Sequence, residues 1–122
     1  MMVGAATIFT VRDIAASVAH YRDAFGFTVT FQYGEPTFYA CLCRDEVSLH
    51  LRAGNDKTRS RSGNGAIAVF VKDVDALHRE LVARGAKVLK PPHDYPYGMR
   101  DFNTVDLDGN ELTFGMESAT AA

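Results

Sequence analysis

The sequence has little of what marks several large classes of protein. Its formal net charge is only −2 over 122 residues, so nothing in the composition points to nucleic acid or an anionic membrane surface. Its apolar runs are too short to span a bilayer. The first residues, MMVGAATIFTV, lack the basic segment and the long apolar segment of a signal peptide. These absences predict a cytoplasmic globular protein.

Cysteine is also scarce. Cys41 and Cys43 are the only two, and they stand two residues apart in a strand-like stretch. We expect both to be reduced, buried and on one face, because they are too close in sequence for an easy disulfide. No further cysteine exists to complete a thiolate metal site.

The sequence contains one pattern of secondary-structure elements that occurs twice. Val11, Asp13 and Ala16 match Val71, Asp73 and Ala76 at a constant offset of sixty residues. In each copy a strand precedes an aspartate that caps an amphipathic helix, and a glycine ends the helix. A repeat at this scale indicates two structural modules rather than one irregular chain.

The repeat sets the predicted elements. In the first module we expect a strand over 6–11, a helix over Ile14–Phe25 and strands over 28–33, 37–43 and 47–52. In the second we expect a strand over 67–71, a helix from Asp73 to Gly85, a strand over 87–90, a rigid Pro/Tyr loop over 91–98 and a closing hairpin. The residues Asp108-Gly109 predict a two-residue hairpin turn.

These elements define a single domain over 1–122. Its modules cover about 5–52 and 66–116, and a polar linker over 53–65 joins them. The predicted class is α+β, with two βαβββ modules in tandem that form a curved mixed sheet, a cup, with the helices outside. The tail over 117–122 has nothing to bury and is expected to fray.

Three segments carry a resemblance in this order and spacing: RDEVSLHL (Arg44–Leu51), YGMRDF (Tyr97–Phe102) and DLDGNELTF (Asp106–Phe114). With the repeated V-x-D motif, they make the chain similar to the vicinal-oxygen-chelate superfamily. That superfamily includes glyoxalase I, extradiol dioxygenases and bleomycin-resistance proteins, and the sequence most resembles the last branch. The resemblance implies a homodimer in which each pocket forms between two chains, often with exchanged segments.

In the metal-using members the resemblance implies a divalent ion held by four positions, which here are Ala6, His50, Ala66 and Thr113. Only His50 is a good ligand. We therefore expect no metal, with a weak alternative in which His50 and Glu111 hold a divalent cation. Glu111 shares a strand face with Thr113, displaced by about 7 Å from the usual ligand position.

A cup without a metal is a pocket for a small molecule. The favoured function is sequestration of an aromatic or cationic compound, as in antibiotic resistance by bleomycin-resistance proteins. The alternatives are a lyase or dioxygenase that uses His50 and Glu111, and a protein that acts by binding another protein. The resistance proteins use tryptophan in their pockets, and this sequence has none. The residues expected to bind the ligand are Phe38, His50, Tyr95, Tyr97, Phe102, Glu111 and Thr113.

Three further points follow from the sequence. The alternation of side chains along a strand does not decide which residues lie beside His50. They are either Tyr39 and Cys41 or Phe38 and Ala40. His20 and His78 lie on helices and are expected to face solvent. Asp106 and Asp108 flank the hairpin turn, which explains them without an acid–base role.

Overall fold

In the computed structural model, which describes residues 1–55 and 57–118, the chain forms two four-stranded sheets, each with one helix. The first module has β1 (Thr7–Val11), α1 (Ile14–Phe25), β2 (Thr28–Tyr33), β3 (Tyr39–Arg44) and β4 (Val47–Ala53). The second has β5 (Ala66–Phe70), α2 (Val74–Arg84), β6 (Lys87–Asp94), β7 (Met99–Val105) and β8 (Glu111–Glu117). The predicted α+β class and the tandem βαβββ plan are confirmed.

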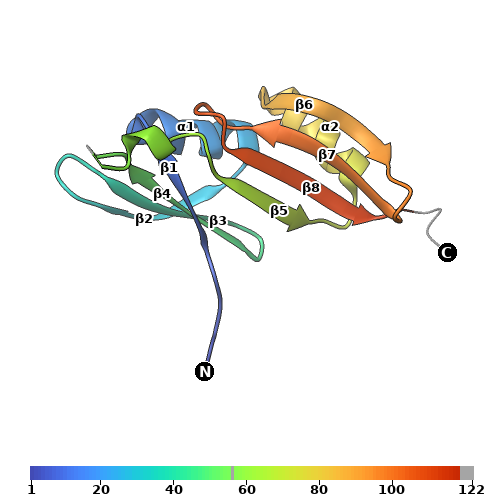
Figure 1. Ribbon diagram of the computed structural model, residues 1–122, viewed down its shortest axis with the longest axis horizontal. Helices are drawn as coiled ribbons and strands as arrows, with labels where there is room; N and C mark the ends of the chain where they lie inside the picture. The colour runs from blue at the N-terminus through green and yellow to red at the C-terminus, as the bar shows by residue number, and fades with distance from the viewer. Residues whose placement is uncertain (56, 119–122) are drawn as a thin grey trace.

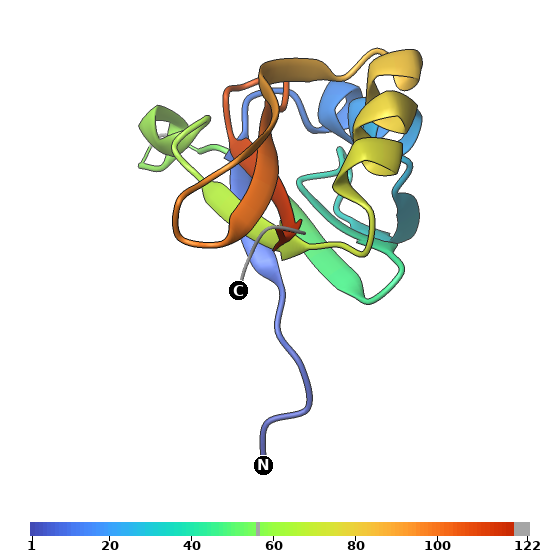
Figure 2. The same ribbon diagram turned by 90° about the vertical axis from the view of Figure 1, so that its right-hand side faces the viewer.

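The two modules have the same topology. The first sheet has the order β1-β4-β3-β2 and the second β5-β8-β7-β6. In each, the first strand pairs in parallel with the last, and the other pairs are antiparallel. The modules lie side by side, with α1 and α2 together on one side of the molecule (Figures 1 and 2). Neither helix in the described chain is long and apolar enough to cross a membrane.

The helix ends repeat as closely as the sequence suggested. Asp13 accepts a hydrogen bond from the Ala16 amide at 3.0 Å, and Asp73 accepts one from the Ala76 amide at 3.0 Å. Gly26 ends α1 and Gly85 ends α2, both with positive φ. The aspartates satisfy amide groups that the first helical turn leaves unpaired.

The core lies between the helices and one face of each sheet. Tyr21 and Phe25 of α1 pack over the first sheet, and Leu81 of α2 packs over the second. Phe102 and Phe114 stack at a centroid distance of 5.3 Å within the second half of the core. His20 and His78 are half-buried against core aromatic rings, so the expectation that they face solvent is wrong.

The Pro/Tyr segment differs most from its prediction. The strand β6 continues through Pro91 and Pro92 to Asp94, and only residues 95–98 form the connection to β7. Proline is tolerated here because β6 is an edge strand, where an amide on the outer side needs no partner. The pairing of β6 with β7 is interrupted twice, between Val88 and His93.

Three smaller expectations also change. The third strand begins at Tyr39, so Phe38 lies in the preceding loop. The linker contains one turn of 3₁₀ helix at Arg59–Arg61. The segment between β7 and β8 spans residues 106–110, longer than a two-residue turn, although Gly109 does adopt the expected positive φ of 103°. The predicted fraying tail covers residues 117–122. The prediction is wrong for Glu117, which ends β8, and for Ser118, which is buried; residues 119–122 lie outside the described residues.

Candidate functional site

Each sheet has a face turned away from its helix, which we call its open face. In a strand, alternate residues share a face, so the pairing register assigns residues to these faces. On the first sheet, the row Ile8, His50, Cys41 and Phe31 crosses the open face. On the second, Ala68, Thr113 and Asn103 form the corresponding row.

The centre of the first open face is a hydrogen-bonded pair. The Tyr39 hydroxyl lies 2.7 Å from His50 Nδ1, and the two rings meet edge to face at 5.4 Å. Cys41 is the direct register partner of His50. The structure thus answers the question that parity left open, since Tyr39 and Cys41 stand beside His50. Both cysteines are free and half-buried rather than buried as expected.

Aromatic side chains are exposed at the β2 edge of the same sheet. Phe31 and Tyr33 stack at 6.3 Å, and Phe38 packs edge-on against Tyr33 at 5.5 Å. Their exposed fractions are 55%, 60% and 50%. Large aromatic groups left in water by a chain's own fold indicate a surface that contacts something else.

The second open face has a polar centre. Thr113 accepts a hydrogen bond of 2.6 Å from the Asn103 side chain. Glu111 lies on the same face but is exposed at the start of β8. Asp101 lies one row beyond Asn103, opposite Gly115. Its Oδ1 atom is buried and has no hydrogen-bond partner among the described residues.

A second aromatic cluster borders this face at β6 and the β6–β7 connection. The His93 and Tyr95 rings lie 4.2 Å apart, and Tyr95 stacks on Tyr97 at 4.9 Å. The Lys90 ammonium lies 5.3 Å from the centre of the Tyr95 ring. Desolvation, reinforced by the nearby Asp101 charge, raises the pKa of Tyr97. Tyr95 and Tyr97 therefore lie together at this border.

Phe102 does not belong with these residues. Its side chain is fully buried on the helix side of the second sheet, where it contacts Phe114 and His78. A ligand on the open face cannot reach it. The assignment of Phe102 as a ligand-binding residue is corrected to a core position, because its neighbours Asp101 and Asn103 take the open face.

The positions at which metal-using relatives would hold a divalent ion do not fit one here. Ala6 and Ala66 carry no donor, and the Thr113 hydroxyl is engaged by Asn103. His50 lies on the first sheet and Glu111 on the second. Within residues 1–55 and 57–118, no three His, Cys, Asp or Glu side chains form a group that could hold a metal ion. A catalytic metal needs about three protein ligands in fixed geometry.

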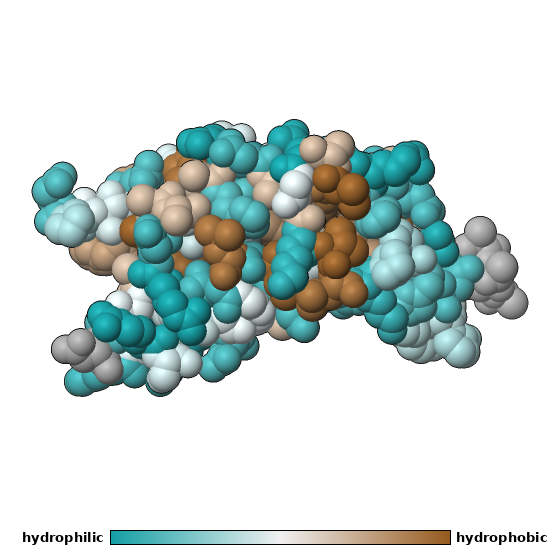
Figure 3. All heavy atoms as spheres, turned by 90° about the horizontal axis from the view of Figure 1, so that it is seen from above, coloured by the Kyte–Doolittle hydropathy of each residue, from teal (hydrophilic) through white to brown (hydrophobic). Residues whose placement is uncertain are grey.

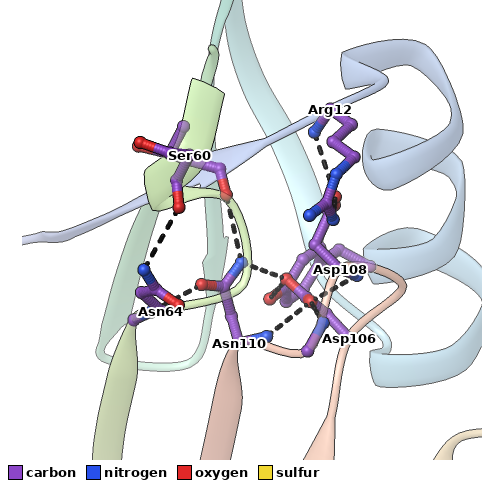
Figure 4. Close-up of polar contacts among 10 residues, drawn as sticks. Arg12, Ser60, Asn64, Asp106, Asp108 and Asn110 are labelled. Carbon is purple, nitrogen blue, oxygen red and sulfur yellow. Dashed lines mark hydrogen bonds and ion pairs between the residues drawn. The ribbon is translucent and has the colours of Figure 1, made fainter. Parts of the chain in front are cut away.

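The carboxyl group of Asp106 has a structural role at the junction of the modules (Figure 4). Its Oδ1 accepts hydrogen bonds from the backbone amides of residues 108, 109 and 110. Its Oδ2 accepts from the Asn110 side chain at 2.9 Å and from the Tyr21 hydroxyl at 2.8 Å. Burial, together with this carboxylate, raises the pKa of Tyr21. These contacts fix the β7–β8 hairpin to α1, which confirms that turn formation explains Asp106.

Other bonds complete this junction. Asn110 Oδ1 accepts from the Gly65 amide at 2.8 Å, and its Nδ2 donates to the Thr10 carbonyl at 3.3 Å. Arg12 forms an ion pair with Asp108 at 3.0 Å. The linker, β1 and the hairpin therefore meet at one point, which holds the two modules in a defined relation.

A cleft of about 660 Å³ lies elsewhere, between the modules. Phe25, Phe27, Leu77 and Leu81 give it apolar walls. At its rim Arg44 pairs with Glu80 at 2.7 Å and donates to the Phe25 carbonyl at 2.9 Å. Figure 3 looks onto the side that carries the helices, where apolar side chains gather towards the middle of the molecule. None of the ligand-binding residues predicted from the sequence lines this cleft.

The sequence analysis missed Asp101 and Asn103 as members of the open faces, and it left Cys41 as one of two alternatives beside His50. The signal was available for the first two, because the alternation in Arg100–Thr104 places Asp101 and Asn103 on one face. Cys41 could not be assigned, since its face depends on how the β3–β4 hairpin pairs.

Comparison with known proteins shows the family and the fold. Residues 5–114 match the model of the glyoxalase/bleomycin resistance protein/dioxygenase superfamily. A bleomycin-binding protein from Streptomyces verticillus, solved with copper(II)-bleomycin, is 27% identical, with a TM-score of 0.75 over 93% of this chain and 95% of that one. A glyoxalase/bleomycin resistance protein from Catenulispora acidiphila is 26% identical, with a TM-score of 0.77 over 94% and 98% of the two chains.

A third structure shares the fold. TnmS3, an antibiotic-binding protein from a Streptomyces species, is 23% identical, with a TM-score of 0.75 over 97% of this chain and 99% of that one. No curated protein matches the sequence. The family match spans nearly all of the chain and both modules. The chain belongs to the glyoxalase/bleomycin resistance protein/dioxygenase superfamily.

Proposed function

We propose that the protein binds a planar aromatic or cationic small molecule on its open faces and sequesters it without a catalytic metal. The observation that carries this proposal is the pair of aromatic clusters, Phe31–Tyr33–Phe38 and His93–Tyr95–Tyr97, that the fold leaves accessible. Aromatic rings of this kind stack on planar ligands and attract cations to their faces.

The second open face carries two carboxylates that support a cationic ligand, and one ammonium, that of Lys90, which already lies over the Tyr95 ring. Asp101 and Glu111 both lie on this face, and Tyr97 is close enough to Asp101 for the carboxylate to affect its pKa. A carboxylate beside aromatic rings is a suitable environment for an ammonium or amidine group. The relative from Streptomyces verticillus is, by its name, a bleomycin-binding protein, so binding of a small molecule has a precedent in a protein of this fold.

Binding without catalysis is the function that the residues fit better. The alternative, a metal-dependent enzyme that uses His50 and Glu111, lacks a third ligand among the described residues. His50 Nδ1 is already engaged by Tyr39. Two polar residues of the second open face, Asn103 and Thr113, hydrogen-bond each other and are suited to orienting a ligand.

We further propose that the protein acts as a homodimer. A pocket must bury most of a ligand's surface, which a single open face cannot do. Ile8 and Phe70 also lie on the open faces, with exposed fractions of 50% and 79%. A second copy that places its open face against the first would cover these groups and enclose the ligand. The two free thiols fit a reducing compartment such as the cytoplasm.

A matched pair of substitutions tests the location of the site. Ala68→Trp places a large ring on the second open face, opposite Thr113. Ala76→Trp places the same ring in the cleft between the modules. Both alanines are exposed, so neither change disturbs the core. The assay is a thermal-shift panel that contains bleomycin with and without copper(II) and the planar cation proflavine.

The proposal predicts that at least one compound stabilises the wild-type protein, by about 2.7 kcal/mol at one hundred times its dissociation constant. Ala68→Trp should abolish that shift and Ala76→Trp should retain it. The reverse pattern would place the site in the cleft. If no compound stabilises the protein and a protein partner co-purifies with it, the small-molecule proposal is wrong.

A further inference from the structure

A nucleophile and a base lie side by side on the first open face. Cys41 and His50 are register partners on neighbouring antiparallel strands, which places their Cβ atoms about 5 Å apart. Tyr39 lies two residues before Cys41 on the same face, with its hydroxyl 2.7 Å from His50 Nδ1. The arrangement has the order of a nucleophile, a base and a group that orients the base.

We propose that Cys41 captures soft electrophiles covalently, with His50 as its base and Tyr39 as a positioning residue. The class of ligand is an apolar α,β-unsaturated carbonyl compound. This goes beyond the proposed function, because reversible binding on aromatic surfaces requires no nucleophile.

The neighbours of Cys41 favour an apolar electrophile. Ile8 and Phe31 flank the His50–Cys41 pair in the same row of the sheet and are 50% and 55% exposed. An apolar ligand that covers this row would bring its reactive carbon over the thiol. Cys43 has a different setting, because its row contains Ser48 and Thr28 and no base.

The reaction is a conjugate addition that balances without a further reactant. His50 accepts the thiol proton at Nε2 while its Nδ1–H donates to the Tyr39 oxygen, the tautomer that leaves Nε2 free. The Cys41 sulfur bonds to the β-carbon, and the π electrons of the C=C bond move to the carbonyl oxygen. The imidazolium then returns the proton to the α-carbon of the resulting enolate.

The two cysteines provide an internal comparison. In the full-length chain, Cys43→Ser leaves only Cys41, and Cys41→Ser leaves only Cys43. Both thiols are half-buried on the same face. The measurement is the rate of addition of N-phenylmaleimide at pH 7, followed by intact-protein mass spectrometry. If either variant folds poorly, peptide mapping of the labelled wild-type protein provides the ratio of the Cys41 rate to the Cys43 rate instead.

We expect Cys41 to react roughly tenfold faster than Cys43, a modest share of what general-base catalysis can supply. His50→Gln should lower the Cys41 rate to that of Cys43 at pH 7, and the loss should shrink at pH 9.5, where thiols ionise without help. Tyr39→Phe should change how the rate of addition to Cys41 depends on pH. A comparable loss in melting temperature should not accompany this change.

Equal rates for the two cysteines, or no effect of His50→Gln at pH 7, would overturn the proposal. Failure of the ligand panel is a separate outcome, because the rate of addition to Cys41 is measured without any compound of that panel. Covalent capture and reversible sequestration can therefore be rejected independently.

Discussion

The hydrogen bond between Tyr21 and Asp106 provides the most direct test of how the modules are held together. Tyr21 is fully buried and Asp106 is 6% exposed. Tyr21→Phe removes only the hydroxyl that donates to Asp106 Oδ2 at 2.8 Å. The ring remains and continues to stack on Phe25 at 5.2 Å, so the substitution isolates the polar contact.

The expected loss follows from the partners that remain. A hydrogen bond to a charged group contributes about 1.5–3 kcal/mol. Asp106 keeps its three backbone donors and the Asn110 side chain, so its carboxylate is not left unpaired. We therefore expect a loss of about 2 kcal/mol in the free energy of unfolding, or about 6–10 °C in melting temperature for a chain of this size.

Urea unfolding followed by circular dichroism measures this loss. The matched control is Tyr33→Phe, since Tyr33 is 60% exposed and its variant should unfold within about 0.5 kcal/mol of the wild-type protein. If Tyr21→Phe also falls within that margin, the hydrogen bond between Tyr21 and Asp106 does not stabilise the junction.

Three further predictions concern pH and packing. The pKa of Tyr21 is raised in the folded protein. Its contribution to stability is therefore complete below the ordinary tyrosine pKa of about 10 and is lost as the pH rises above that value. Urea unfolding measured from pH 9 to 11 should show a decline in the free energy of unfolding that Tyr21→Phe lacks. The Arg44 hydrogen bond, and then Arg84, lowers the pKa of Glu80, so that ion pairing stabilises the protein above the ordinary glutamate pKa of about 4.3 and ceases as pH falls through the lower folded value. Carboxyl NMR titration should show the Glu80 pKa rising in Arg44→Met, and an unchanged value would contradict the assignment. Gly65→Ala should cost about 1–3 kcal/mol, because its Cβ would overlap the buried Phe9 ring and lie 2.9 Å from Asn110 Oδ1, whereas Gly4→Ala, which meets nothing within 4 Å, should be neutral in the same urea assay.

Local chemistry made most of the fold predictable from the sequence. Asp13 and Asp73 are caps whose effect extends over one helical turn, and Gly26 and Gly85 end the helices within the same range. The errors arose where pairing between strands outweighs local preference. Pro91 and Pro92 argued against a strand, but the edge position of β6 tolerates them.

The candidate site was less predictable because it depends on register. A shift of one residue in the β3–β4 hairpin would exchange Tyr39 and Cys41 for Phe38 and Ala40 beside His50. Phe102 was misassigned for the same reason, since one position along β7 separates the core from the open face. The composition correctly indicated that the chain has many aromatic residues, but it could not indicate which of them remain exposed.

The central claim is that the open faces bind a small molecule without a metal. Isothermal titration of the panel compound with the largest thermal shift, before and after dialysis of the protein against EDTA, tests it most directly. If no metal takes part in binding, the dissociation constant is the same in both titrations. Loss of the binding heat after EDTA treatment, and its recovery on addition of a divalent cation, would show that binding needs a metal.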